Sequence, residues 1–361
     1  MSASAFDRDE PKYLRLAQGL RAQIAGGDLR AGDRLPSFSQ LRARHGVTGA
    51  TVERVYALLE REGLIERQHG RGTFVARRAR THCLGFLSGL ARAGLGVPYW
   101  AHLIEGAQEA AHRAGYELLL LNAGAHPVRW ERVDGVLNSY RREGTPELFA
   151  GLPDAMPQVC LLSQARGVAS VLADDFGGMQ LAVEHLLELG HRRIGYLVAA
   201  SGWQQEMRLA GYRSALSAAG IAAQESWIRP ISAPTVTGHF VNTGYHEMTA
   251  WLREGWRDLG CTALLCQNDD TAIGALDALD EVGVRVPDEL SVVGFDGLDH
   301  SLRPRLTTVA VPLRDIGARA VELLLEQLAG GRATPSGLLL PTRLQLGAST
   351  APAPDRTRND V

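Results

Sequence analysis

Short apolar runs alternate with amphipathic segments over most of the chain after residue 82. Residues 83–88 (CLGFLS), 116–121 (YELLLL) and 133–137 (VDGVL) are apolar runs that are too short for helices, so they predict buried strands. Between the first two runs, residues 99–114 predict a helix. Strands that alternate with helices are typical of α/β domains built on parallel sheets.

The segment from residue 262 to 311 gives the most detailed prediction. It opens with an apolar run (TALLCQ) that predicts a strand, and Asn268 and Asp269 then supply N-cap side chains for a helix. The apolar residues of that helix recur at three-residue steps along one face: Ile273, Leu276, Leu279 and Val282. A second strand (LSVVGF) follows, with Asp296 just beyond its carboxyl end. Because ligands of open α/β sheets bind outside the carboxyl ends of strands, Asn268 and Asp296 are the first candidates for a ligand pocket.

The amino-terminal part has a different pattern, in which helices are followed by short strands. Residues 13–24 predict a helix, and the S-x-x-Q of Ser37 and Gln40 is a capping box for a second one. Thr48 can cap a third helix over residues 49–62, and the run LIERQHGRGTFV then predicts two strands around a glycine turn. This order of helices, turn and β-wing is that of a winged helix-turn-helix unit, which binds DNA.

Two parts of the chain resemble two different families. Residues 11–76, with LPS, EREGLI and GRGTFV in that order, resemble the winged helix-turn-helix domain of the GntR family. Residues 82–347, with an Asn-Asp pair before a helix and then DELSVVGFDGLD and PRLTTVAV, resemble the effector domain of the LacI/GalR repressors. That domain is similar to periplasmic sugar-binding proteins, and the combination is similar to arabinose-repressor-type regulators. It implies a winged helix-turn-helix (α+β) followed by a two-lobed α/β fold of the periplasmic-binding-protein type (type I).

The resemblance also implies domain boundaries. We expect a DNA-binding domain at residues 1–76, a short linker at 77–81, an effector domain at 82–347 and a disordered tail at 348–361. Within the effector domain, lobe 1 is expected at about 82–173 and 310–337, and lobe 2 at about 174–309 and 338–347. One departure from the family lies at residues 122–133, where 12 residues that include a proline leave room for only a turn or two of helix.

The positions at which the GntR family contacts bases differ in this chain. Phe38 and Ser39 stand where Glu and Arg are common, Thr48-Gly49 stands where Ser-Arg is common, and Glu53 stands where arginine is frequent. We therefore expect an operator that differs from the common consensus of the family. The remaining candidates for DNA contact are Arg42, Arg44, Thr48, Ala50, Thr51, Arg54, His69 and Arg71. Arginines can bind guanine edges or phosphates, although Arg42 and Arg44 could equally be solvated surface charges.

The LacI/GalR resemblance further implies ligand-binding residues. Tyr99 and Trp100 stand at the start of the first effector-domain helix, and Arg208 lies in an R-L-A-G-Y segment that reaches the effector in the family. The full set of candidates is Tyr99, Trp100, Trp203, Arg208, Asn268 and Asp296. Structural alternatives remain open: Tyr99 as a core aromatic, Arg208 as the partner of a surface carboxylate and Trp203 as a shield of the hinge. Asp296 is expected to face the wet cleft, or alternatively to cap the following loop.

Charge is unevenly distributed along the chain, although the net charge is only −2. Residues 1–80 hold 15 basic and 9 acidic residues (+6), and residues 81–361 hold 23 basic and 31 acidic residues (−8). This asymmetry fits a basic nucleic-acid module joined to an acidic sensor. No run approaches the roughly 20 apolar residues of a membrane span, and the start lacks the features of a secretory signal, so we expect a cytoplasmic protein.

Motifs for catalysis are missing from the sequence. The four cysteines lack metal-ligand or redox spacing, and His185 and His191 fit packing or helix capping better than metal ligation. No pair of nucleophile and base is recognisable, and no glycine-rich phosphate loop follows a strand. We therefore expect no catalytic residues, no metal, no cofactor and hence no enzyme.

These patterns together predict a ligand-responsive transcriptional regulator, with a repressor favoured. We expect a homodimer that binds an inverted-repeat operator and changes its DNA affinity when a small molecule closes the two lobes. A monosaccharide or polyol is favoured as the effector, because Arg208, Asn268 and Asp296 offer hydroxyl partners and tryptophans offer stacking surfaces. A purine is the second candidate. A sugar receptor without a regulatory role is the remaining alternative, against which the DNA-binding module argues.

Overall fold

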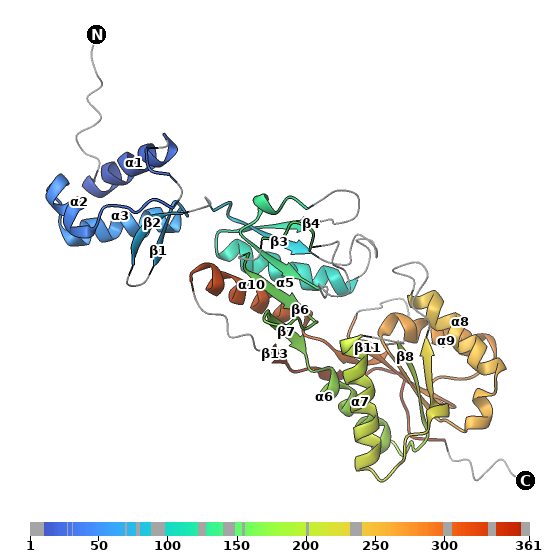
Figure 1. The fold of residues 1–361 in the computed structure, drawn as a ribbon. Helices are drawn as coiled ribbons and strands as arrows, with labels where there is room; N and C mark the ends of the chain where they lie inside the picture. The colour runs from blue at the N-terminus through green and yellow to red at the C-terminus, as the bar shows by residue number, and fades with distance from the viewer. Residues whose placement is uncertain are drawn as a thin grey trace, which may run out of the picture. The chain divides into compact units, whose positions relative to one another are not determined.

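The computed structural model divides into two compact units between His82 and Cys83 (Figure 1). The structure describes residues 11–26, 28–30, 32–68, 71–76, 80–87, 98–121, 128–139, 149–153, 156–199, 202–231, 240–298, 305–330 and 337–354. Among these residues, no helix is both long enough and apolar enough to cross a membrane. The unit boundary falls at the start of the first strand of the α/β region.

The first unit combines three helices with a two-stranded wing. Its elements are α1 (Lys12–Ala25), α2 (Phe38–His45), α3 (Gly49–Arg61), β1 (Ile65–Gln68) and β2 (Gly72–Val75). The two strands pair in antiparallel register, and the helices enclose a buried apolar core that includes Leu20, Leu41, Val55, Tyr56 and Leu59. The predicted winged helix-turn-helix fold is thus confirmed.

Local sequence signals fix the turn between α2 and α3. The Ser37 hydroxyl accepts a hydrogen bond from the Gln40 N–H, and the Gln40 side chain accepts one from the Ser37 N–H, so the capping box is confirmed. Gly46 ends α2 at a φ of 58°, a left-handed conformation that glycine adopts at little cost. Thr48 caps α3 by accepting a hydrogen bond from the Thr51 N–H at 3.2 Å.

The second unit contains two six-stranded sheets, of which the first forms lobe 1. Its strand order is β13-β7-β6-β5-β3-β4, and all of its pairs are parallel. These strands are β3 (Cys83–Leu87), β4 (Glu117–Leu121), β5 (Gly135–Asn138), β6 (Gln158–Leu161), β7 (Ala169–Ala173) and β13 (Gly337–Leu340). Helices α5 (Pro98–Arg113) and α10 (Leu313–Leu328) pack so closely that a Cβ on Gly106 would lie 2.0 Å from the Arg314 carbonyl oxygen.

The second sheet forms lobe 2 and has the order β14-β12-β11-β10-β8-β9. Its strands are β8 (Ile194–Ala199), β9 (Ile228–Ile231), β10 (Ala263–Cys266), β11 (Ser291–Asp296), β12 (Thr307–Ala310) and β14 (Arg343–Gln345). Its pairs are parallel except that of β12 with β14. The lobe also holds α6 (Asp175–Glu188), α7 (Trp203–Ala218), α8 (Phe240–Arg253) and α9 (Asp269–Glu281), with 3-10 turns η3 (Glu225–Trp227) and η4 (Trp256–Leu259). The predicted two-lobed α/β architecture is confirmed.

Three described segments connect the lobes: residue 174 between β7 and α6, residues 311–312 between β12 and α10, and residues 341–342 between β13 and β14. The last connection corrects the expectation that lobe 2 resumes at residue 338. Leu338 pairs with Val171 and Leu340 with Ala173, so the strand at 337–340 completes the sheet of lobe 1.

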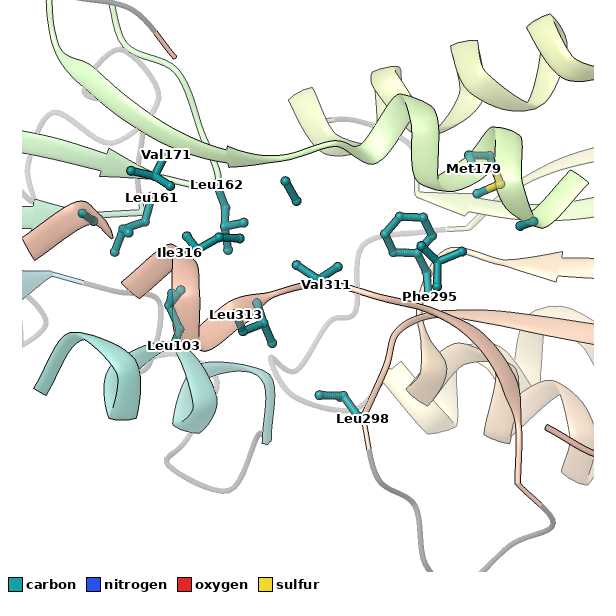
Figure 2. Close-up of a cluster of buried hydrophobic side chains, with 14 of the residues drawn as sticks. Leu103, Leu161, Leu162, Val171, Met179, Phe295, Leu298, Val311, Leu313 and Ile316 are labelled. Atoms are coloured by element: carbon teal, nitrogen blue, oxygen red, sulfur yellow. The ribbon is translucent and has the colours of Figure 1, made fainter. Parts of the chain in front are cut away.

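Apolar side chains surround the connection between β12 and α10. Figure 2 shows Val311 on this segment, with Leu313 and Ile316 on the α10 side and Phe295 on the β11 side. All four belong to one buried cluster that continues into both lobes. The connection is therefore packed against its surroundings, which restricts the movements that are open to the lobes.

The short crossover between β4 and β5 contains no α-helix in its described part. Residues 122–127 lie outside the described residues, and the rest holds one 3-10 turn, η1 (Trp130–Arg132). Trp130 is buried with Phe149, Leu152 and Met156, and its indole N–H donates to the Ala150 carbonyl at 2.8 Å. These side chains cover apolar surface of the sheet that a longer helix would otherwise cover, so the predicted shortening is confirmed for the described part.

The segment after residue 347 is partly ordered, which corrects the expectation of a disordered tail over residues 348–361. The Val292 N–H donates to the Ser349 carbonyl at 2.8 Å, and the Ser349 hydroxyl donates to the Val292 carbonyl at 2.6 Å. His191 is fully buried and bonds the Ala351 carbonyl through Nε2 at 3.0 Å. These backbone partners order residues 348–354, whereas residues 355–361 lie outside the described residues.

The buried face of α9 also differs from the predicted one. Val282 is 47% exposed, and the residues that are fully or almost fully buried are Asp269, Thr271, Ala272, Gly274, Ala275, Ala278 and Leu279. The reason is close packing against α8, because a Cβ on Gly274 would lie 1.8 Å from the Val241 carbonyl oxygen. Small residues thus define the contact surface, which a pattern of large apolar residues does not reveal.

Candidate functional site

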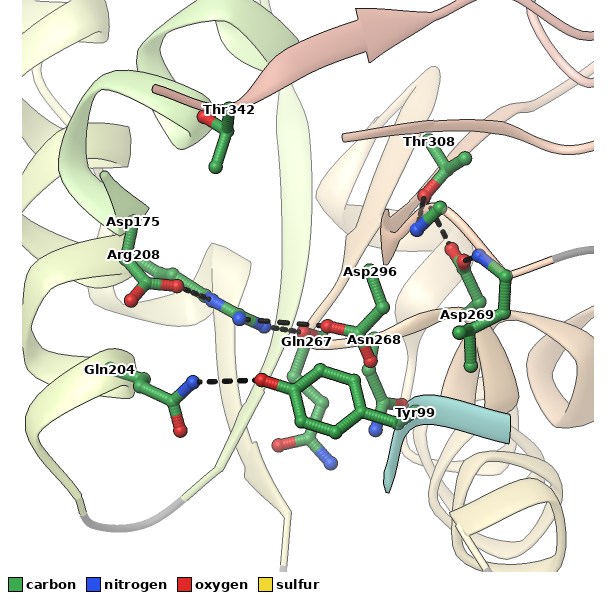
Figure 3. Close-up of polar contacts among 12 residues, drawn as sticks. Tyr99, Asp175, Gln204, Arg208, Gln267, Asn268, Asp269, Asp296, Thr308 and Thr342 are labelled. Atoms are coloured by element: carbon green, nitrogen blue, oxygen red, sulfur yellow. Dashed lines mark hydrogen bonds and ion pairs between the residues drawn. The ribbon is translucent and has the colours of Figure 1, made fainter. Parts of the chain in front are cut away.

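Arg208 is the centre of a buried polar cluster at the carboxyl edge of the lobe 2 sheet (Figure 3). Although it lies in α7, only 2% of the residue is exposed. Its Nε donates to Asp175 Oδ1 at 2.8 Å, and its Nη1 donates to the Gln267 carbonyl oxygen. Its guanidinium carbon lies 3.6 Å from the centroid of the Phe295 ring. These contacts fix the guanidinium and exclude a surface carboxylate as its partner.

Asp296 is the last residue of β11, and it is buried. Only 7% of the residue is exposed, which corrects the expectation that its carboxylate faces a wet cleft. Its Oδ1 lies 3.6 Å from Arg208 Nη2. Burial raises the pKa of Asp296 well above its usual value, and Arg208 opposes this shift. The backbone of Asp296 has a φ of 118°, which is rare for a residue with a side chain.

The charges of this cluster do not balance. Burial works against the charge of Arg208, but the carboxylates of Asp175 and Asp296 outweigh it and hold the pKa of Arg208 above its usual range. Burial also raises the pKa of Asp175, against the effect of Arg208. One guanidinium therefore faces two carboxyl groups, and the cluster has an excess of negative charge whenever both are ionised.

Asn268 and Asp269 have different roles at the start of α9. The Asn268 side chain accepts a hydrogen bond from the Thr271 N–H at 2.9 Å, which caps the helix as predicted. Asp269 is fully buried and accepts hydrogen bonds from the Leu298 N–H at 2.8 Å and the Thr308 hydroxyl at 2.5 Å. Burial raises the pKa of Asp269 to about 7, although these hydrogen bonds favour its charged form. Asp269 thus holds the loop that follows Asp296.

Lobe 1 contributes Tyr99, from the first turn of α5. Its hydroxyl accepts a hydrogen bond from Gln204 Nε2 in α7 at 3.3 Å, so this contact joins the two lobes. Trp100 is half-buried and packs edge-on against Tyr99, with ring centroids 5.6 Å apart. Trp203, the first residue of α7, is also half-buried. The structure therefore brings Tyr99, Arg208, Asn268 and Asp296 into one region (Figure 3).

The candidate DNA-contacting residues lie on the first unit. Arg42, Arg44, Arg54 and Arg71 are exposed, and none forms an ion pair with another described residue, so their charges are available for phosphates or bases. Ala50 is exposed as well. The hydroxyls of Thr48 and Thr51 lie 2.9 Å apart and bond each other at the cap of α3. His69 lies outside the described residues.

Phe38 and Glu53, which depart from the residues common in the GntR family, both have partners within the first unit. The Phe38 ring packs edge-on against the buried Tyr56, with centroids 5.3 Å apart. Glu53 forms an ion pair with Arg67 of β1 at 2.8 Å. Phe38 therefore anchors α2 on α3, where a polar residue would face solvent or DNA.

Comparisons with known proteins agree with the fold of both units. Residues 12–75 match the model for bacterial regulatory proteins of the gntR family, and residues 183–350 match the periplasmic binding protein-like domain. A solved LacI family transcriptional regulator from Enterococcus faecium, with bound ribose, is similar with a TM-score of 0.62 and 25% identity, covering 75% of this chain and 99% of that one. The HTH-type transcriptional repressor PurR of Pectobacterium carotovorum is 32% identical, covering 74% of this chain and 80% of that protein. The chain belongs to the LacI family of transcriptional regulators.

This LacI-family regulator carries the gntR-type unit described above at its amino terminus. A relative with similarity along nearly the whole chain is the arabinose metabolism transcriptional repressor of Geobacillus stearothermophilus. It is 26% identical over 347 residues, which cover 88% of this chain and 91% of that protein. The similarity thus extends over both units of the regulator.

Sequence reasoning missed several polar residues in and around this candidate site. Asp175 follows the carboxyl end of β7, so the rule that identified Asn268 could also have found it. Gln267 directly follows β10 and carries the same signal, although its contact with Arg208 is made by its backbone carbonyl. Gln204 and Thr308 carry no such signal, because their roles depend on contacts between distant segments. In lobe 1, Ser163 follows β6, and its buried hydroxyl has no hydrogen-bond partner among the described residues.

Removing the charge of Arg71 at the start of the second wing strand is expected to weaken DNA binding without altering sequence preference. An Arg71→Ala variant should lose affinity for operator and random DNA by similar factors, because a phosphate contact carries no sequence information. Its plot of log affinity against log salt concentration should be shallower by about 1. Fluorescence anisotropy titrations at four salt concentrations measure both effects. An unchanged salt slope would show that Arg71 does not contact the backbone.

Proposed function

We propose that this LacI-family regulator is a sugar-responsive repressor that binds an inverted-repeat operator as a homodimer. A two-fold symmetric protein contacts two half-sites related by the same symmetry, usually one helical turn or a multiple apart. The regulator acts by binding and not by catalysis, in the compartment that holds the chromosome, the cytoplasm. The observation that carries the effector proposal is the buried arrangement of Arg208, Asp175 and Asp296 opposite Tyr99.

The donor and acceptor groups of this cluster suit neighbouring hydroxyls of a sugar. Arg208 donates through Nε and Nη1 to protein partners, so its Nη2 is the group that remains to face Asp296 and a ligand. Asp296 oxygens accept hydrogen bonds, and one hydroxyl can accept from Arg208 while it donates to Asp296. A vicinal diol therefore satisfies both side chains at once.

The excess of negative charge in the cluster favours an uncharged effector. Asp175 already neutralises Arg208 at 2.8 Å, and Asp296 stands 3.6 Å from the same guanidinium. An anionic group, such as a sugar phosphate or a carboxylate, would approach two carboxyl groups for each cation in a buried site. Such a ligand would bind only if one of the carboxyl groups took up a proton.

Ligand binding changes the equilibrium between open and closed arrangements of the two lobes, and this change is transmitted to the DNA-binding unit. The segments that connect the lobes are discontinuous in sequence, a topology typical of hinge closure. Gln204 and Tyr99 contact each other across the lobes, so a ligand between Arg208 and Tyr99 would bind one arrangement more tightly. A ligand shifts the equilibrium only by this difference in affinity. The arabinose-metabolism relative and the ribose-bound structure support a sugar as the ligand.

A thermal-melting panel tests the effector class. L-arabinose, D-ribose and cellobiose are compared with ribose 5-phosphate and with hypoxanthine, each at 1, 5 and 20 mM. A neutral sugar present at about 100 times its Kd is expected to stabilise the protein by about 2.7 kcal/mol, which raises the melting temperature by several degrees. Ribose 5-phosphate should give no shift. A shift with hypoxanthine alone would replace the sugar proposal with the purine alternative.

A binding assay on DNA completes the test. An operator is selected from a random library with the full-length protein, and its affinity is then measured with and without the sugar that shifts the melting temperature. The expected result is weaker DNA binding in the presence of the sugar. Light scattering of the complex without sugar should give the mass of two chains on one operator. A single chain on the selected operator would contradict the dimer, and tighter binding would contradict release by the effector.

A further inference from the structure

The exposed face of α3 carries a carboxylate close to its DNA-contacting end. Val52, Val55 and Tyr56 of this helix are buried, whereas Ala50, Glu53 and Arg54 are exposed. In a helix-turn-helix domain the amino-terminal residues of the recognition helix contact base edges in the major groove. Glu53 is thus placed with Ala50 and Arg54 on the surface that meets DNA.

The carboxylate of Glu53 is held in place by the wing. Arg67 of β1 donates from Nη1 to Glu53 Oε1 at 2.8 Å, and its Nε lies 3.0 Å from Glu60 Oε2. Glu53 and Glu60 stand two helical turns apart on the same side of α3, so one guanidinium bridges both. This arrangement fixes the direction of the Glu53 side chain, which still exposes 51% of its surface.

The negative charge of Glu53 limits which DNA groups can lie next to it. Phosphates repel it, and Arg67 only partly offsets that repulsion because it serves two carboxylates. In the major groove, guanine and thymine present acceptor oxygens at the matching positions, and adenine presents an acceptor N7 beside its amino group. Cytosine presents only its amino group, so it is the base that a carboxylate tolerates best.

We propose that Glu53 recognises a cytosine amino group in each operator half-site and that Arg67 is the residue that positions it. Glu53 gains a hydrogen bond from the cytosine N4 group only where cytosine stands opposite it, and elsewhere its charge costs affinity. The residue therefore contributes to specificity more than to overall affinity. The free arginines Arg42, Arg54 and Arg71 contribute the attraction to phosphates that offsets this cost.

Selection and substitution of operators with the full-length protein test the proposal. The wild-type protein should select a cytosine at one position in each half-site, and its replacement by thymine should weaken binding by roughly 5- to 150-fold. Glu53→Gln should lose most of this penalty and should bind random DNA more tightly, because a charge that repels phosphates has been removed. Its preferences at the other positions of the half-site should remain.

Glu60→Gln is the matched control, because it breaks the other ion pair of Arg67 and keeps the carboxylate on the DNA-contacting face. It should retain the cytosine preference of the wild-type protein. Melting temperatures of both variants are compared with wild type, so that a loss of folding is recognised separately from a loss of specificity. The proposal is overturned if Glu53→Gln selects the same operator with the same penalty for thymine, or if Glu60→Gln loses the preference equally, which would mean that Glu53 only supports the wing.

Discussion

An Arg208→Met variant is expected to be destabilised by about 3–5 kcal/mol, because removal of one partner of a buried ion pair leaves the others without a counter-charge. The carboxylates that remain are Asp175 and Asp296, whose side chains are only 3% and 8% exposed. Methionine preserves much of the apolar contact with Phe295, so the loss of stability results mainly from the removal of the charge. The denaturant midpoint of the full-length variant should fall accordingly.

The destabilisation of Arg208→Met should depend on pH in a defined direction. Burial already raises the pKa of both Asp175 and Asp296, and without Arg208 nothing in the cluster opposes that shift. An acid whose folded pKa lies above its unfolded value destabilises the fold fully above the folded pKa and not at all below the unfolded one. The stability gap between wild type and variant should therefore be smaller at pH 5 than at pH 8.

Arg213→Met is the matched control for this variant. Arg213 lies in the same helix, and it pairs with Glu225 at 2.7 Å, but both side chains are exposed. Exposed ion pairs of this kind contribute at most about 1 kcal/mol, so this variant should unfold close to the wild-type midpoint at both pH values. If Arg208→Met also unfolded close to the wild-type midpoint, the stability of the buried cluster would not depend on Arg208.

The elements of both units were largely predictable because their signals are local. The capping box of Ser37 and Gln40 and the cap at Thr48 involve residues only three positions apart. The strands of the α/β region are short apolar runs, and parallel sheets bury such runs on both faces. Periodicity and caps therefore sufficed for the fold class, whereas the strand pair of Leu338 with Val171 depends on partners far apart in the chain.

The burial of the candidate site was less predictable from the sequence, because it depends on how the whole lobe packs together. Asp296 was correctly placed at the carboxyl edge of the sheet, but its burial results from the packing of Arg208 of α7 beside it. The order of residues 348–354 likewise depends on distant partners. Their polar, proline-containing composition favours disorder, but hydrogen bonds to Ser291 and Val292 impose order. Neither result can be derived from a window of neighbouring residues.

The described start of the loop after β11, residues 297 and 298, argues against Asp296 as the cap of this loop. A carboxylate that capped this loop would accept its backbone N–H groups, but the Leu298 N–H donates to Asp269 at 2.8 Å. The Gly297 N–H lies 3.3 Å from the Thr308 hydroxyl, which in turn donates to Asp269. Asp269 and Thr308 therefore hold the described start of the loop, and the carboxylate of Asp296 is left to face Arg208.

An Asp296→Asn variant is expected to bind the effector at least tenfold more weakly and to keep its fold and its DNA affinity. Hydrogen bonds to a charged group contribute roughly 1.5–3 kcal/mol each, and a loss of about 1.4 kcal/mol is tenfold in affinity. Asparagine is chosen because it tolerates the positive φ of 118° better than most residues. Its stability should stay near that of wild type, since removal of a charge that burial disfavours offsets the loss of the contact with Arg208.

Isothermal titration calorimetry with the sugar that gives the largest melting shift measures the affinity, and melting curves measure the stability. Asp288→Asn is the matched control, because it removes the same charge from an exposed position on lobe 2, where the side chain is 71% exposed. It should bind the sugar as wild type does. An Asp296→Asn protein with a lowered melting temperature and an unchanged Kd would instead make Asp296 a structural residue, and the effector would then have to be held by Arg208, Asn268 and Tyr99 without it.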